Sequence, residues 1–167
     1  MRTLKTGYTL LEVLVVLVII SIVAGMAMLS LGHNENKELQ AFTRELAEIL
    51  SLAEEQALLQ PTTLGLMLRP HSFGLYEYRK TQHQMAWQAL NDRELGIREM
   101  PADTQIILQI ANQTVSQEEQ GEKPPIIIST NGTLTPFTML IGKKNKKPRY
   151  KLSGLADGTI SAEVYLR

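Results

Sequence analysis

The feature that most constrains this chain is an apolar run, residues 8–31, that begins directly after a short basic leader. Arg2 and Lys5 are the only charged side chains before Gly7, and Glu12 is the only charged side chain inside the run. As a helix the run would measure about 36 Å at about 1.5 Å per residue, which exceeds the roughly 30 Å hydrocarbon core of a membrane. Basic residues on its N-terminal side predict a cytoplasmic N-terminus and an exported C-terminal part. We therefore expect a transmembrane helix over residues 8–31.

Two ordinary explanations of such a run account for only part of it. A secretory signal has an apolar region of about 7–15 residues and a small-residue cleavage site, which Ala24-Gly25-Met26-Ala27 could supply. The run is too long for this class of signal and contains a carboxylate. An uncleaved anchor explains the length but gives no reason for Glu12, because a carboxylate in an apolar segment costs several kcal/mol unless it is paired or kept near the interface.

Cleavage between Gly7 and Tyr8 would give Glu12 a partner. Gly7 leaves room for a protease that works at the membrane face, and the cut creates a positive amine at Tyr8. Residues four apart share a helix face, so this amine could pair with Glu12 of its own chain or of a neighbouring chain. In a low-dielectric bundle such a pair would set the axial register of the helices.

The same segment carries a family resemblance. Lys5-Thr6-Gly7-Tyr8-Thr9-Leu10-Leu11-Glu12 closely resembles the class III signal of type IV pilins and pseudopilins. The resemblance implies that a prepilin peptidase cuts after Gly7 and methylates the new N-terminus at Tyr8, where the family usually has Phe. It also implies that Glu12 is the family's glutamate at the fifth mature position.

Residues 32–60 are predicted to be an amphipathic continuation of the helix. From residue 36 to residue 60 the apolar side chains recur at steps of three and four, and Pro61 then ends the pattern. This apolar face consists of Leu39, Phe42, Leu46, Ile49, Leu50, Ala53 and Ala57. We expect it to lie on a sheet. Gly32-His33-Asn34 is either a break between two helices or a polar collar within one.

Residues 61–167 are predicted to be a β-rich domain. The expected strands are residues 63–69, 72–79, 84–90, 104–111, 125–129, 133–141, 150–153 and 159–166. Asn131-Gly132 and Asp157-Gly158 are typical hairpin dipeptides, so residues 125–129 are expected to pair with 133–141. Residues 91–100 and 112–123 are expected to be loops, the second of them mobile. The fold class is therefore α+β: a long N-terminal helix, transmembrane in its first half, packed on an antiparallel β-sandwich.

This second part is similar to the globular domain of the H-type minor pseudopilins of type II secretion. The similar pieces include Ala86-Trp87-Gln88-Ala89-Leu90, Asn131-Gly132-Thr133-Leu134-Thr135-Pro136-Phe137 and Leu155-Ala156-Asp157-Gly158-Thr159-Ile160. The resemblance implies a cleaved leader (residues 1–7), a single-pass anchor in the bacterial inner membrane and a periplasmic C-terminal domain. It implies as partners the prepilin peptidase, other minor pseudopilins, the major pseudopilin and the inner-membrane assembly platform. A minor pilin of a type IV pilus or competence fibre is the alternative.

The remaining composition argues against catalysis. The three histidines (His33, His71 and His83) have no metal-ligand spacing, there is no cysteine, and no phosphate-binding or nucleophile motif occurs. We therefore expect no enzymatic activity, no metal and no cofactor, which leaves an uncut membrane-anchored enzyme without a candidate site.

The one dense charge cluster is basic. It consists of Lys143, Lys144, Lys146, Lys147 and Arg149. It is expected to be a solvated hairpin tip that could meet an acidic partner subunit. Contact with a nucleic-acid backbone is not expected because the net charge is +0.

Overall fold

The computed structural model describes residues 9–81, 84–116 and 121–165, with the backbone alone for residues 27–35. The chain divides into two compact units, residues 1–37 and residues 38–167. One helix, α1 (Leu10–Leu59), contributes to both units.

Helix α1 begins and ends where local chemistry dictates. Thr9 caps its start, since the backbone N–H of Glu12 donates to the Thr9 carbonyl at 3.0 Å and to Thr9 Oγ1 at 3.3 Å. The helix ends at Leu59, just before Pro61, whose ring is incompatible with the helix interior. Its backbone remains helical through Gly32-His33-Asn34, so the polar triplet lies within one helix.

The second half of α1 supplies one side of the core of the globular unit. All seven residues of the predicted apolar face are between 0% and 4% exposed, so this prediction is confirmed. The Phe42 and Phe73 rings meet edge to face with centroids 5.6 Å apart, which is a preferred aromatic geometry. Thr43, the one buried polar residue on this face, satisfies its hydroxyl by donating to the Leu39 carbonyl at 2.7 Å.

Two antiparallel sheets complete this unit. The first contains β1 (Leu64–Leu68), β2 (Ser72–Lys80), β3 (Met85–Ala89), β4 (Arg98–Glu99) and β7 (Ile126–Ile128). Its strand order is β3-β2-β1-β7, with β4 also paired to β2. The second contains β5 (Thr104–Ile110), β6 (Gln113–Val115), β8 (Phe137–Lys143), β9 (Tyr150–Gly154) and β10 (Ile160–Val164). Its strand order is β10-β9-β8-β5-β6.

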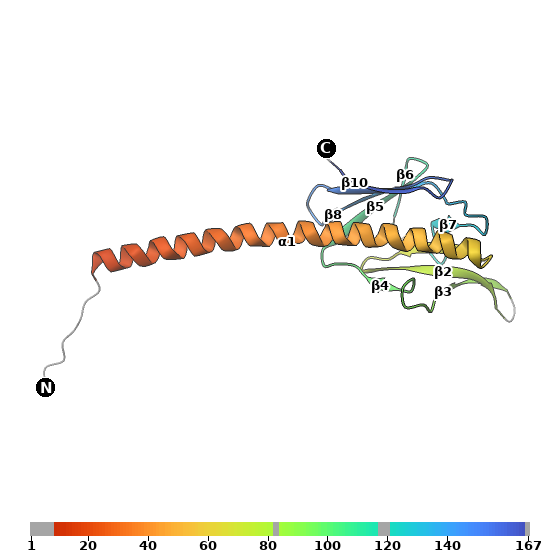
Figure 1. Cartoon of the computed structure of the whole chain (residues 1–167), viewed down its shortest axis with the longest axis horizontal. Helices are drawn as coiled ribbons and strands as arrows, with labels where there is room; N and C mark the ends of the chain where they lie inside the picture. The colour runs from red at the N-terminus through yellow and green to blue at the C-terminus, as the bar shows by residue number, and fades with distance from the viewer. Residues whose placement is uncertain (1–8, 82–83, 117–120, 166–167) are drawn as a thin grey trace, which may run out of the picture. The chain divides into compact units, whose positions relative to one another are not determined.

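The two sheets face each other across α1. Figure 1 shows the second half of the helix passing between the sheet that contains β2 and β3 and the sheet that contains β5, β8 and β10. The core cluster accordingly combines residues of α1 with inward-facing residues of both sheets, among them Leu66, Phe73, Met139 and Leu152. The predicted fold, a helix on an antiparallel sandwich, is confirmed.

The predicted hairpin at Asn131-Gly132 forms next to its turn but does not extend along β8. The Ser129 N–H donates to the Thr133 carbonyl and the Thr135 N–H donates to the Ile127 carbonyl, both at 2.9 Å. The turn does form, with Gly132 at φ 77° and its N–H donating to the Ser129 carbonyl at 2.9 Å. However, β7 pairs with β1, whereas β8 pairs with β5 and β9 in the other sheet. The reason lies at Pro136, which has no N–H to continue a ladder, so after a single bridge between Ile128 and Leu134 the chain changes sheets.

The loop predicted at residues 112–123 is also partly wrong, because Gln113–Val115 form strand β6. Ala111 and Asn112 both have positive φ values, 50° and 63°, as in the two-residue turn that matches the twist of a hairpin. This turn pairs Ile110 with Gln113. Similarly, the predicted loop at residues 91–100 contains the short strand β4 near its end.

Candidate functional site

The predicted processing site lies outside the described residues, which begin at Thr9. Gly7 and Tyr8 therefore remain predictions. Glu12, the predicted register residue, lies in the first turn of α1, and its side chain is exposed. A carboxylate in this position is favoured by the partial positive charge of the helix N-terminus.

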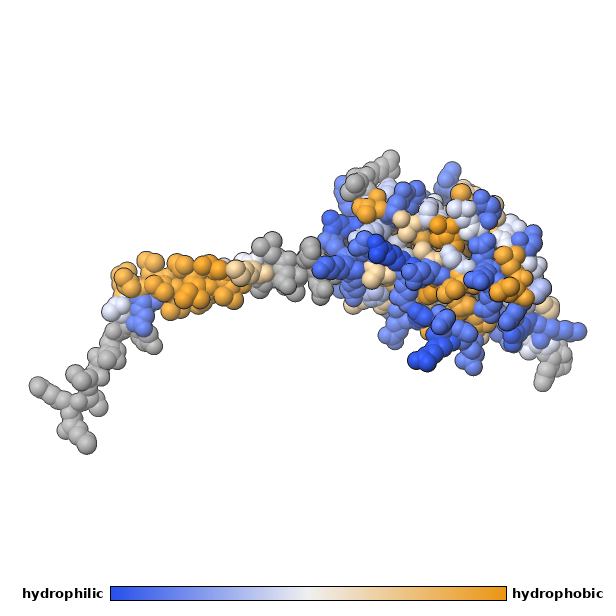
Figure 2. All heavy atoms as spheres, in the orientation of Figure 1, coloured by the Kyte–Doolittle hydropathy of each residue, from blue (hydrophilic) through white to orange (hydrophobic). Residues whose placement is uncertain are grey.

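The first half of α1 is apolar on every side. All side chains from residue 9 to residue 26 are exposed, and Figure 2 shows hydrophobic residues covering most of the visible face of this part of the helix. Ser21 satisfies its hydroxyl internally by donating to the Leu17 carbonyl at 2.8 Å. A helix that is apolar all round needs apolar neighbours.

No helix among the described residues is long and apolar enough to cross a membrane.

Lys143 is the last residue of β8, and the other four basic residues lie in the connection from β8 to β9, as predicted for a hairpin tip. Lys144, Lys146, Lys147 and Arg149 are exposed, whereas the Lys143 side chain is only 10% exposed. Asn145 turns the chain with φ 61°, and the Lys146 N–H donates to the Lys143 carbonyl at 3.1 Å. We call residues 143–149 the basic loop.

The basic loop is held in a defined conformation by the strands around it. The Lys144 N–H donates to the Asp103 carbonyl at 2.8 Å, and the Arg149 N–H donates to the Ile141 carbonyl at 2.9 Å. Pro148 covers Gly142 so closely that a Cβ added at Gly142 would lie 2.9 Å from Pro148 Cα. The positive charges are therefore presented on a folded scaffold.

Two carboxylates of α1 connect the helix to both sheets. Lys143 Nζ lies 3.1 Å from Glu38 Oε2 and donates to the Ala102 carbonyl at 2.5 Å. Seven positions along the helix, Arg98 of β4 pairs with Glu45 and also donates to the Glu94 carbonyl at 2.7 Å. The helix is thereby fixed to the β5–β8 sheet by one pair and to the β1–β2 sheet by the other.

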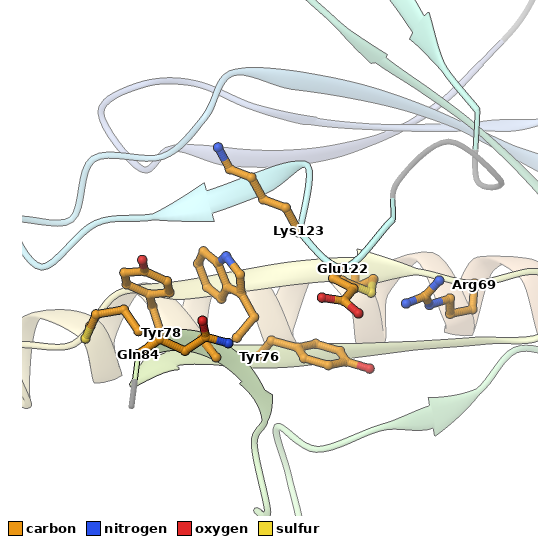
Figure 3. Close-up of a pocket in the computed structure, with 10 residues that line it drawn as sticks. Arg69, Tyr76, Tyr78, Gln84, Glu122 and Lys123 are labelled. Carbon is orange, nitrogen blue, oxygen red and sulfur yellow. The ribbon is translucent and has the colours of Figure 1, made fainter. Parts of the chain in front are cut away.

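A groove of about 600 Å³ lies on the face of the β1–β2 sheet that points away from α1. Its floor comprises Met67, Tyr76, Tyr78 and Trp87, and the Tyr78 and Trp87 rings lie 5.1 Å apart. Figure 3 shows Arg69 and Glu122 at one end of the groove and Tyr78 and Gln84 at the other.

This groove has the composition of a protein contact surface. Tyr, Trp, Met and Arg are enriched at interfaces, and the aromatic pair offers a large apolar area with polar tips. The sequence-based predictions do not include this groove. The signal that could have found it was the alternation of Tyr76 and Tyr78, which the strand register brings opposite Ala89 and Trp87.

Among the described residues, three carboxyl groups have pKa values below their usual range, and local hydrogen bonds explain each shift. Burial opposes ionisation of Glu77, but hydrogen bonds from Arg79 and Thr62 outweigh it and hold the Glu77 pKa below its usual value. Backbone N–H groups of Leu95 and Glu94 lower the pKa of Asp92, and the Thr159 N–H lowers that of Asp157. Each is explained by a turn or strand contact.

The described residues include no group of His, Asp or Glu placed to hold a metal ion. His71 is exposed in the turn between β1 and β2, where its carbonyl accepts the Met100 N–H at 2.9 Å. The side chain of His33 and the whole of His83 lie outside the described residues.

Comparison with protein families identifies the N-terminal segment. Residues 2–28 match the prokaryotic N-terminal methylation motif. The match covers the leader, the predicted cleavage point, Glu12 and most of the apolar run.

Curated relatives share similarity along nearly the whole chain. The type II secretion system protein H of Aeromonas hydrophila is 27% identical over 93% of this chain and 91% of its own length. The protein of the same name from Pseudomonas aeruginosa is 26% identical, with 91% of each chain covered.

The fold has a solved counterpart. The minor pseudopilin EpsH from the type 2 secretion system of Vibrio cholerae matches with a TM-score of 0.64 at 16% identity, over 75% of this chain and 94% of that chain. The resemblance predicted from the sequence is confirmed.

Proposed function

We propose that the chain works as an assembled structural subunit of a type II secretion system. We start from its sequence signature and fold, which are those of an H-type minor pseudopilin. A prepilin peptidase removes residues 1–7 and methylates Tyr8. Before assembly, residues 8–31 of the mature helix span the inner membrane as a single-pass anchor, and residues 61–167 lie in the periplasm.

Assembly then replaces lipid with neighbouring helices. The observation that carries this proposal is the methylation motif over residues 2–28, which includes the part of α1 where every described side chain, up to residue 26, is exposed. Such a surface can leave lipid only if other helices cover it, and close packing must drive this because lipid is equally apolar. The amine of Tyr8 pairs with Glu12 of the same or an adjacent subunit and sets the register.

The globular unit makes the remaining contacts at the fibre tip, where the chain joins other minor pseudopilins above the major pseudopilin. The aromatic groove offers a surface for protein contact, and the ion pairs of Glu38 and Glu45 keep the domain aligned with its helix segment. Force from the inner-membrane assembly platform would therefore be transmitted through α1 to the sheets.

Two substitutions test the N-terminal part of this proposal. We expect Gly7→Leu to block cleavage, visible as an unprocessed band on a gel. We expect Glu12→Ala to be cleaved but to crosslink poorly to other pseudopilins and to reduce secretion. Glu48→Ala removes an exposed carboxylate further along α1 and serves as the control. Normal secretion by the Glu12→Ala strain would refute the register role.

A further inference from the structure

We propose that the basic loop, residues 143–149, docks on anionic phospholipid headgroups at the membrane surface while the protein is outside the fibre. This inference rests on the proposed membrane anchor and goes beyond it by assigning a ligand to the loop. The ligand chemistry is a phosphate-bearing lipid surface of net negative charge.

The basic loop begins close to the end of the apolar run. Lys143 contacts Glu38 at 3.1 Å, and Glu38 follows the end of the apolar run at Leu31 by seven positions. Even a fully extended chain would place Glu38 within about 25 Å of that end, at about 3.3–3.6 Å per residue. In helical form the distance is about 10 Å, at about 1.5 Å per residue. Lys143, at the start of the loop, is therefore tethered by the chain to the end of the apolar run.

The basic loop presents a strongly positive surface. Four of its five basic residues are exposed, and no acidic residue occurs between Lys143 and Arg149. The loop itself carries five positive charges and no negative charge. Positive charge is in excess, and each Lys or Arg near an anionic surface strengthens binding by about fivefold.

The basic residues of the loop lie too far along the sequence to oppose export. Basic residues close behind a transmembrane segment oppose export, and only Lys37 and Arg44 occur between Leu31 and Pro61. The five basic residues come far later, from position 143, where they no longer influence topology. Folding then places the first of them, Lys143, beside Glu38. The chain thus combines an export-compatible sequence with a basic surface close to the membrane.

The test uses full-length protein in lipid nanodiscs. The chain has no cysteine, so Gln105→Cys provides a single labelling site on an exposed residue paired with Gly142 at the base of the loop. Energy transfer from this label to a headgroup acceptor is measured in neutral discs and in discs containing about a third phosphatidylglycerol. A label at Ala156→Cys, at the opposite end of β9, reports on the far end of the domain.

We expect higher energy transfer at Gln105→Cys in anionic discs than in neutral discs, and its loss in high salt, where the Debye length falls to about 3 Å. The triple variant Lys144→Glu, Lys146→Glu, Lys147→Glu should reduce the docked-to-free ratio at least about tenfold, given about fivefold per charge. It spares Lys143 and hence the ion pair with Glu38.

A matched triple variant at exposed basic residues elsewhere, Lys80→Glu, Arg93→Glu and Lys123→Glu, changes net charge equally and should retain docking. Equal energy transfer in neutral and anionic discs, with the protein retained in both, would overturn the docking proposal alone. Failure of the chain to remain in either disc would overturn the anchor as well. Duplex DNA binding the loop more tightly than anionic discs at the same salt would assign the cations to nucleic acid instead.

Discussion

Breaking the ion pair between Lys143 and Glu38 should destabilise the globular unit more than breaking a shorter pair on the surface. The perturbation is Lys143→Met, which keeps the aliphatic stem and removes the charge, together with Glu38→Gln and the double variant. The control is Lys151 and Glu163, which pair across β9 and β10 at 2.8 Å. The Lys143 pair is longer, at 3.1 Å.

Burial decides the expected magnitudes. The Lys143 side chain is 10% exposed and also donates to the Ala102 carbonyl, whereas Glu38 is 50% exposed and can regain water. A hydrogen bond to a charged group contributes about 1.5–3 kcal/mol, which we reduce to about 1–2 kcal/mol because Glu38 is half exposed. The control pair is 33% and 59% exposed, so we expect about 0.5 kcal/mol or less, as for surface pairs.

The assay is urea unfolding of the full chain in detergent, followed by the fluorescence of Trp87, the only tryptophan, which packs against Tyr78. A loss of about 1–2 kcal/mol corresponds to a fall in melting temperature of roughly 3–8 °C for a unit of this size. The double-mutant cycle should give a coupling of about 1 kcal/mol for Lys143 with Glu38, and less for the control. Equal couplings, or a larger one for the shorter control pair, would refute the argument from burial.

Two further predictions concern packing and pH. Gly154→Ala should lower the free energy of unfolding by about 1–3 kcal/mol, because the new Cβ would lie 2.3 Å from Phe137 Cε1. The control is Gly25→Ala, which should leave the unfolding of the globular unit unchanged because its new Cβ would have no atom within 4 Å. Equal effects of the two substitutions would contradict this prediction. Glu77→Gln should lose about 1–2 kcal/mol near neutral pH through its bonds to Arg79 and Thr62. Since the folded Glu77 pKa lies below its usual 4.5, this contribution is present above that value and disappears as pH falls through the folded pKa. A wild-type advantage that persists undiminished at pH 2 would count against it.

The helix and most strands could be predicted because their signals are local. The apolar periodicity of residues 36–60 identifies the buried face of α1, and Pro61 and Asp157-Gly158 mark where elements end or turn. These signals need no knowledge of distant residues. The turn at Ala111-Asn112 escaped prediction because Ala rarely adopts positive φ.

Pairings between distant segments could not be read in the same way. The Asn131-Gly132 dipeptide predicts a turn, but Pro136 sends the following strand to the other sheet, and that choice depends on which edges are available. Lys143 and Glu38 are 105 positions apart, so no local sequence pattern predicts their contact. The groove combines residues of three strands and a later loop, and only the strand register brings these together.

The N-terminus of the native protein shows whether the chain is trimmed as a pseudopilin. Intact-mass and N-terminal analysis should be performed on protein purified from membranes of cells with an active prepilin peptidase, and from cells lacking that peptidase. We expect a chain that begins with methylated Tyr8 in the first case and with the uncut leader in the second. A chain that still carries residues 1–7 in cells with active peptidase would contradict this expectation.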